Sequence, residues 1–216
     1  VLLVPHPAIL PQRIQCTSHA RLCFVLRFTR PRQRVGVELA QRQQQAHGLD
    51  AVVDALATAG KDLLYMAMCT PDRYASATPG SGKYDGGGGG FTGSNQVPTT
   101  AGKTAWSNFA TALAQRYNGS GHGRISTYEI WNEVNYASYW AGTHAQYAEL
   151  LRLFRNAVRA VDATLKVGAP TIQEPEGTGD DWLTAFLSAS DGAAGTGKDH
   201  MDYCFVHLYP PKYNFG

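Results

Sequence analysis

Apolar residues in this 216-residue chain switch repeatedly between helical and strand-like spacing, and this alternation constrains the fold more than any other feature. In the segment 49–60 they recur at i, i+3, i+4 and i+7, the spacing of an amphipathic helix. The run DLLYMAMC that follows is typical of a buried strand, because it is short, apolar and closed by Thr70-Pro71. The expected helices are 49–60, 106–117, 147–161 and 182–187, and the expected strands are 62–69, 124–131, 166–170 and 201–210.

This order of helices and strands predicts parallel βαβ units. Two architectures contain such units, the open doubly wound sheet and the (β/α)8 or TIM barrel. The glycine-rich first turn that usually marks the open sheet is missing, and the pentaglycine Gly86–Gly90 lacks the Lys and Ser/Thr of a phosphate-binding loop. Polar residues instead follow several strands, among them Asn132-Glu133 and His207, which is where a barrel builds its active site. We therefore predict an α/β fold, an incomplete (β/α)8 barrel with four recognisable strands.

Charge divides the chain into two segments. Residues 1–47 hold seven arginines, no lysine and one acidic residue, whereas residues 48–216 hold twelve basic and sixteen acidic ones. The net charge of +2 is too small to indicate a nucleic-acid or membrane partner. We predict a basic N-terminal segment, 1–47, to which the sequence assigns no structure, and a partial barrel domain, 48–216, that carries the function.

Several single residues are also assigned by their surroundings. Cys69 and Cys204 lie in apolar strand-like runs, so we expect both to be buried free thiols. His200 is expected on the surface. The opening run VLLVPHPAIL is too short and too broken by proline for a signal peptide, and no apolar run is long enough to span a membrane.

The string YEIWNEVN, residues 128–135, places a carboxylic acid, Glu133, where an expected strand ends. Glycoside cleavage needs one carboxyl group to protonate the leaving oxygen and a second carboxylate on the other face of the sugar. Aromatic and amide neighbours partly desolvate such a carboxyl group, which raises its pKa towards neutrality and keeps it protonated. The amide of Asn132 can bond a sugar hydroxyl. Four nearby aromatic residues can stack on sugar rings or pack in the core: Trp131, Tyr136, Tyr139 and Trp140.

These residues resemble the Trp-Asn-Glu-Pro-type signature of clan A glycoside hydrolases, with Val134 where proline is more usual. The flanking strings LLYMAMCTPDRYAS, WSNFATALAQRY, KVGAP and MDYCFVHLYP are similar to neighbouring elements of that clan. Together they cover about residues 48–212 and most resemble glycoside hydrolase family 39, the β-xylosidase and iduronidase group. The resemblance implies that the third to sixth strands of the barrel are present in a truncated chain.

The same resemblance implies roles for individual residues. Glu133 is the acid/base of a retaining mechanism, and Asn132 holds the sugar 2-hydroxyl. His207 and Tyr209 line the site and orient the sugar or the nucleophile. Trp131, from the same string, completes the expected set of substrate-binding residues.

The family's nucleophile is a glutamate at the end of the seventh strand, and we expect it to be absent from this chain. Glu174 and Glu176 follow the fifth strand and could replace it, but no motif supports them. No cofactor or metal is expected, because two carboxylates and water suffice for the reaction. The expected partner is a carbohydrate substrate, the oligomeric state is left open, and we expect a secreted or extracellular protein.

Two other hypotheses stay open. The chain can be a non-catalytic, carbohydrate-binding remnant of a glycosidase, in which aromatic residues bind sugar without turnover. Alternatively, it is an enzyme with a doubly wound sheet, in which the string YEIWNE is coincidental. The second of these requires an open sheet with Glu133 remote from His207.

Overall fold

The computed structural model describes residues 48–76, 83–84, 91–92, 95–173 and 179–208. Several sequence features lie outside these residues, so the predictions made for them stay predictions. They are the basic segment 1–47, the pentaglycine, Glu174, Glu176 and Tyr209.

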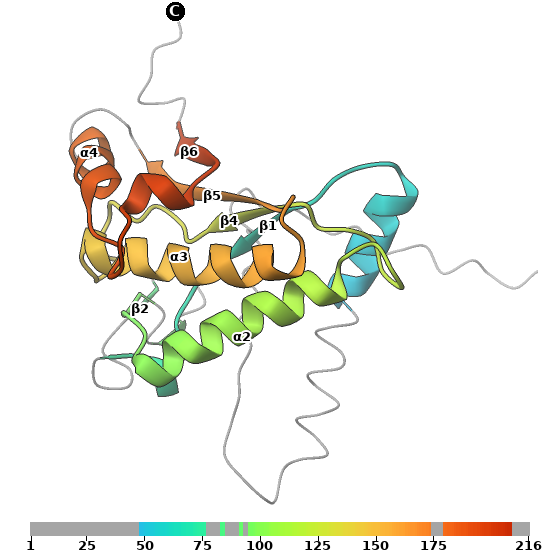
Figure 1. The fold of residues 1–216 in the computed structure, drawn as a ribbon, viewed down its shortest axis with the longest axis horizontal. Coiled ribbons are helices and arrows are strands. Elements are labelled where there is room, and N and C mark those ends of the chain that lie inside the picture. The colour runs from blue at the N-terminus through green and yellow to red at the C-terminus, as the bar shows by residue number, and fades with distance from the viewer. Residues whose placement is uncertain (1–47, 77–82, 85–90, 93–94, 174–178, 209–216) are drawn as a thin grey trace, which may run out of the picture.

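Four parallel strands form the main sheet (Figure 1). They are β1 (Leu64–Ala67), β4 (Thr127–Ile130), β5 (Lys166–Gln173) and β6 (Tyr203–His207), and they lie side by side in that order. Each strand is parallel to the next. A doubly wound sheet changes direction at a switch point, whereas neighbours in chain order form the wall of a barrel. The described sheet is therefore part of a (β/α)8 barrel, and the doubly wound alternative is wrong.

The connecting helices also follow the prediction. Residues 48–58 form the first helix, and the others are α2 (Thr100–Arg116), α3 (His144–Val161) and α4 (Asp180–Ser188). Figure 1 shows α2 and α3 side by side on one side of the sheet. Thr99 and Thr143 begin these two helices, because each side chain accepts a hydrogen bond from the backbone N–H three residues further on.

Short elements occupy some of the connections. They are η1 (Asp72–Tyr74), β2 (Lys83–Tyr84), β3 (Phe91–Thr92) and η3 (Gly197–His200). The strands β2 and β3 pair antiparallel on either side of the pentaglycine, in a stretch for which the sequence predicted neither helix nor strand. Two-residue strands carry no periodic pattern, so the sequence could not indicate them.

The core lies between the sheet and the helices α2 and α3. Tyr128 on β4 meets Phe154 on α3 edge to face, with ring centroids 5.5 Å apart, and Trp106 on α2 contacts the same phenylalanine at 5.1 Å. Full burial of a side chain such as Phe154 stabilises the fold by about 1.5–3 kcal/mol. The apolar pattern predicts one buried face for α3, and five of its six residues are buried there, namely Tyr147, Leu150, Leu151, Phe154 and Val158, whereas Val161 is partly buried.

The sequence predicts that this strand ends at Pro170, but β5 continues to Gln173. Pro170 lies between Gly168 and Thr171, where the pairing with β6 shifts register, so its missing N–H breaks no regular ladder bond. Gly168 makes room for the neighbouring strand, since a Cβ atom there would lie 2.1 Å from Cε2 of Phe205.

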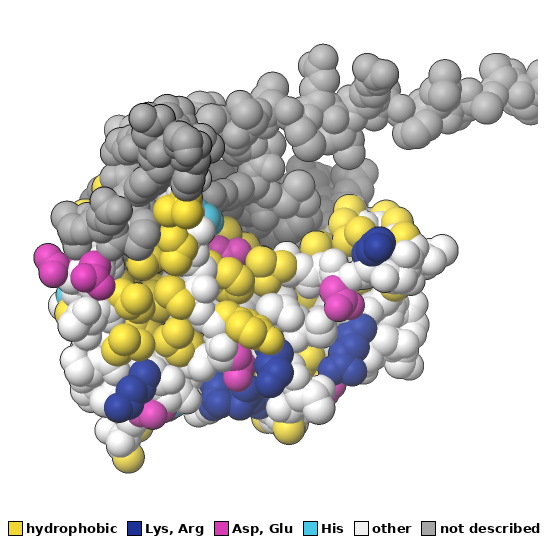
Figure 2. Space-filling view, turned by 90° about the horizontal axis from the view of Figure 1, so that it is seen from above, with side chains coloured by type: hydrophobic (Ala, Val, Ile, Leu, Met, Phe, Trp, Pro, Cys, Tyr) yellow, Lys and Arg dark blue, Asp and Glu magenta, His cyan; other side chains and the backbone are white. Residues whose placement is uncertain are grey.

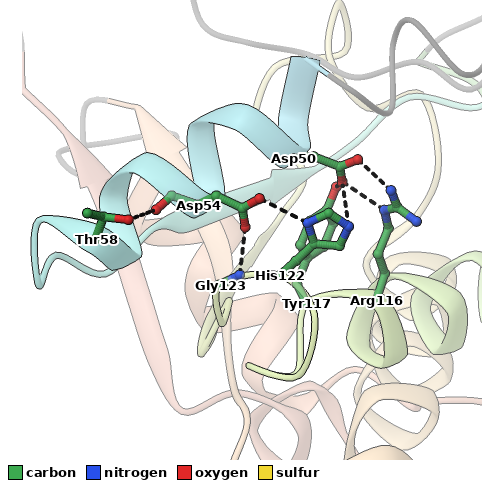
Figure 3. A network of polar contacts seen from close by, with 7 residues as sticks. All are labelled: Asp50, Asp54, Thr58, Arg116, Tyr117, His122 and Gly123. Atoms are coloured by element: carbon green, nitrogen blue, oxygen red, sulfur yellow. Dashed lines mark hydrogen bonds and ion pairs between the residues drawn. The ribbon is translucent and has the colours of Figure 1, made fainter.

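A polar network joins the first helix to the C-terminal end of α2 (Figure 3). Arg116 donates hydrogen bonds to both carboxylate oxygens of Asp50, and the Tyr117 hydroxyl donates to Oδ1 at 2.8 Å. The hydrogen bonds from Arg116 hold the pKa of Asp50 below its ordinary value. Burial, together with the Asp50 contact, raises the pKa of Tyr117 to about 12. These partners replace the water that the buried Asp50 carboxylate loses.

Asp54, one turn further along the same helix, forms the second half of this network (Figure 3). Its carboxylate accepts a hydrogen bond from the Gly123 N–H at 2.8 Å and lies 3.0 Å from Nδ1 of His122. The Gly123 hydrogen bond, followed by the His122 contact, lowers the pKa of Asp54. Two acidic side chains of one helix therefore hold the connection between α2 and β4.

Two of the burial predictions are wrong. Cys69 is buried as expected, but Cys204 is exposed, because β6 is the last strand of the described sheet. His200, expected on the surface, is buried, and its Nε2 lies 2.6 Å from Oδ2 of Asp191.

Candidate active site

The backbone is strained just beyond the C-terminal ends of β1 and β4. Within the described ranges, the non-glycine residues with positive φ are Cys69 at 76°, Trp131 at 66° and Glu133 at 44°. Such conformations cost of order 1–3 kcal/mol each and persist only where surrounding contacts impose them, often at functional sites. The strained residues therefore lie at the edge of the sheet where the sequence predicts the active site.

Glu133, the predicted acid/base, lies beside His207 at this edge. Nδ1 of His207 is 2.7 Å from Oε1 of Glu133. His207 is the last residue of β6 and Glu133 follows β4, so the contact passes across the end of β5, which lies between them. Glu133 is only 2% exposed, so the contact fixes a carboxyl group that is shielded from bulk water. The structure thus brings these two predicted site residues together.

The turn that carries Glu133 is attached to the strands on both sides of β4. The Trp131 N–H donates to the Ala67 carbonyl of β1 at 2.8 Å, and the Val134 N–H donates to the Thr171 carbonyl of β5 at 3.1 Å. These two bonds hold the turn from opposite sides. The position of the Glu133 backbone is therefore set by the sheet itself.

The other predicted site residues differ in their burial and contacts. Asn132 is 1% exposed and adjoins Glu133 at the end of the strand. Trp131 is equally buried: its Nε1 donates to the Tyr139 carbonyl at 2.6 Å, and its ring meets Trp140 edge to face at 5.0 Å. The Trp131 indole thus belongs to the core, and its contact with a sugar stays a prediction. Tyr209 lies outside the described residues.

Sequence reasoning missed two further residues of the string YEIWNEVN. Glu129 on β4 is buried, and its Oε1 accepts a hydrogen bond from the Thr171 hydroxyl at 2.6 Å. Asn135 makes two hydrogen bonds to the backbone of Gln173. A signal existed for Glu129, an acid between the apolar residues of a strand, but none for Asn135, whose partner lies 38 residues away.

This edge therefore holds a shielded carboxyl group, an imidazole in contact with it and an adjacent carboxamide. A carboxyl group so placed can give and take a proton, and a carboxamide can bond a hydroxyl group. No group of three or more metal-ligating side chains occurs in the described part of the chain. Nor do the described residues include a helix of the length and apolarity that a membrane span requires.

A family model, Glycosyl hydrolases family 39, matches residues 34–216. The chain belongs to this family. A beta-xylosidase from Geobacillus stearothermophilus is 38% identical over 90 residues, which are 41% of this chain and 16% of that protein. Another beta-xylosidase, from Caldicellulosiruptor saccharolyticus, is 29% identical over 172 residues, 77% of this chain and 31% of that protein. The chain thus spans less than a third of either relative's length.

Comparison with solved structures supports the same barrel. The crystal structure of a monomeric beta-xylosidase from Caulobacter crescentus CB15 matches with a TM-score of 0.51 and 20% sequence identity. The match covers 74% of this chain and 30% of that one. At this identity the similarity concerns the fold alone, and it agrees with the assignment of the described family 39 sheet to a (β/α)8 barrel.

Proposed function

We propose that the protein containing this sequence hydrolyses O-glycosidic bonds with retention of configuration, with Glu133 as the acid/base. Membership of glycosyl hydrolase family 39 supports the reaction class. The observation that carries the residue assignment is the contact between Glu133 and His207 at the C-terminal edge of the sheet. The contact fixes the orientation of a shielded carboxyl group, and it places an imidazole beside that group as it loses and regains its proton.

In this mechanism Glu133 acts twice. It first gives its proton to the leaving oxygen, and it then removes a proton from the water that releases the sugar. His207 orients Oε1 and stabilises the carboxylate that remains after the first step, because an imidazole N–H can donate to it. Asn132 supplies the amide for a sugar hydroxyl.

The retaining mechanism also needs a nucleophilic carboxylate roughly 5–5.5 Å from the acid/base. We assign this role to none of the described residues. Glu129, the buried carboxylate on β4, is engaged by the Thr171 hydroxyl and takes part in no chemical step of the proposal.

The substrate class follows from the names of the relatives. Both sequence relatives and the matched crystal structure bear the name beta-xylosidase, so we propose a β-linked xyloside as the substrate. Water is the only co-reactant in such hydrolysis. A secreted or extracellular location is part of the same proposal.

Substitution of Glu133 tests the assignment. In the complete protein, Glu133→Ala should lower kcat/KM for an alkyl β-xyloside by about 10²–10⁴-fold, the usual contribution of general acid catalysis. Azide should restore turnover of an activated aryl β-xyloside in this variant and give a β-xylosyl azide, because azide attacks without needing a base. Asp62→Ala, a change at an exposed residue remote in sequence, is the control.

The outcomes separate the two functions. A wild-type protein that cleaves no aryl glycoside but binds xylo-oligosaccharides, with Glu133→Gln leaving that binding intact, would support the carbohydrate-binding remnant instead. Activity that survives in Glu133→Ala without azide would remove Glu133 from the mechanism.

A further inference from the structure

The regular pairing between β4 and β5 ends before Glu133 is reached. Its last matched residues are Glu129 and Gly168. Beyond this point the chain turns through two left-handed residues, Trp131 and Glu133, and such a turn must be held by contacts from outside itself. Rate is sensitive to this geometry, since a displacement of about 1 Å can cost a reaction about 10²-fold.

Asn135 supplies such a contact to β5. Its Nδ2 donates to the Gln173 carbonyl at 2.9 Å, and its Oδ1 accepts from the Gln173 N–H at 3.0 Å. By donating to and accepting from the same residue, the carboxamide makes the pair of bonds that two directly opposed residues exchange in an antiparallel ladder. Together with the Val134 N–H bond to Thr171, it continues the attachment between β4 and β5 after the strand has ended.

The residue that Asn135 binds also lies next to the strand that carries His207. In the register of β5 and β6, Gln173 lies opposite His207. Gln173 thus contacts the turn that carries Glu133 on one side, and on the other side it pairs with β6, the strand that carries His207. Asn135 therefore adds a side-chain attachment to the turn from which Glu133 reaches His207 at 2.7 Å.

We propose that Asn135 is a positioning residue for the acid/base. Its carboxamide holds the turn after β4 against Gln173, and so aligns the Glu133 carboxyl group with His207 and with the leaving oxygen of the substrate. This inference rests on the proposed role of Glu133, and it adds a residue that touches neither the substrate nor the reacting atoms.

Two substitutions test the contact, with a matched control. Asn135→Ala removes both hydrogen bonds, whereas Asn135→Asp keeps the shape and the acceptor but sets a carboxylate oxygen against the Gln173 carbonyl. Ser138→Ala changes an exposed side chain in the same turn region and serves as the control. All three are made in the complete protein, and kcat/KM is measured for a series of β-xylosides whose leaving groups differ in pKa.

The leaving-group series distinguishes misalignment from simple loss of folded protein. A dinitrophenolate departs without a proton, whereas an alkoxide needs one from the acid. If Asn135 aligns Glu133, both variants lose about 10²-fold in kcat/KM for the alkyl xyloside but less than about threefold for the dinitrophenyl xyloside. A smaller amount of folded enzyme would lower both by the same factor.

Any of four results would overturn the inference. If the loss is equal for all leaving groups, or no larger than in Ser138→Ala, Asn135 does not align the acid, even though Glu133 keeps its role. If Asn135→Asp behaves as wild type, the donated hydrogen bond is unnecessary. If the wild type is inactive on every xyloside, the proposed function fails and the inference fails with it.

Discussion

Tyr128 and Tyr147 are both fully buried, but only one of their hydroxyl groups has a hydrogen-bond partner. The Tyr147 hydroxyl donates to the carbonyl of Ile130, the last residue of β4 before the strained turn. The Tyr128 hydroxyl has no partner in the described structure. Burial raises the pKa of both phenols, so both stay neutral and able to donate. The two buried hydroxyl groups therefore differ in hydrogen bonding.

Paired substitutions measure this difference. Tyr128→Phe should leave the free energy of unfolding unchanged or raise it by up to about 1 kcal/mol, because it removes a buried unpaired hydroxyl group. Tyr147→Phe should lower it by about 1–3 kcal/mol, because a buried carbonyl loses its donor. Urea unfolding with comparison of midpoints and m-values provides the measurement. An equal loss in both variants would mean that Tyr128 has a partner in solution.

At the residue scale, the sequence could predict the site where its signal was local. Asn132 and Glu133 belong to one short string, so their place at a strand end could be read from it. The burial of His200 could not, because it depends on η3 packing against α3 and on the partner Asp191. The exposure of Cys204 could not either, since an apolar run does not reveal which strand lies at an edge.

Hydrogen bonds and ion pairs of acidic side chains join several helices and strands of this protein. The same contacts favour the ionised form of these side chains. Asp202, just before β6, accepts two hydrogen bonds from Arg159 of α3, at 2.8 and 2.9 Å, and one from the Val167 N–H of β5. Burial alone would raise the pKa of Asp202, but the bonds from Val167 and Arg159 hold it below its ordinary value. Asp50 and Asp54 fasten the first helix in the same way.

This arrangement predicts a stability that falls in acid. Because the pKa of Asp50 is lower in the folded chain than in the unfolded one, its contribution is complete above the unfolded value of about 4. It is then lost as the pH falls through the folded value. The free energy of unfolding in urea should decrease from pH 6 to pH 3, and Asp50→Asn should reduce that decrease. An Asp50→Asn profile parallel to the wild-type profile, as expected of the exposed control Asp62→Asn, would contradict the prediction.

At the element scale, the order of the fold could be predicted, but several limits could not. The helices α2 and α3 were indicated by long apolar periods, which are strong signals. The continuation of β5 past Pro170 was missed, because the register shift that accommodates the proline depends on β6. Sequence periodicity indicates which face of an element is buried. It does not indicate which neighbouring strand accommodates an irregular residue such as Pro170.

The whole described sheet has two unpaired edges, β1 and β6. Large apolar side chains are exposed there, including Leu64 on β1 and both Tyr203 and Val206 on β6. Figure 2 shows hydrophobic side chains gathered on the face of the molecule seen from above. Open strand edges with apolar side chains pair readily with other chains.

The isolated 216-residue chain should therefore associate. We expect its sedimentation coefficient to rise with concentration, and we expect Val206→Lys to weaken the association because a lysine at an edge opposes strand pairing. Val52→Lys, which adds the same charge on the exposed side of the first helix, is the control. A single monomeric species at all concentrations, with a cooperative thermal transition, would contradict this prediction.

The strand order described above also has a consequence for biosynthesis. Within the four-stranded sheet, β4, β5 and β6 each pair with the strand of that sheet that comes before them in the chain, so the sheet can grow in the order in which the ribosome delivers it. The last described strand to emerge, β6, carries His207. Glu133 therefore emerges well before its imidazole partner, and a nascent chain that has reached only β5 holds the acid group without the histidine that contacts it.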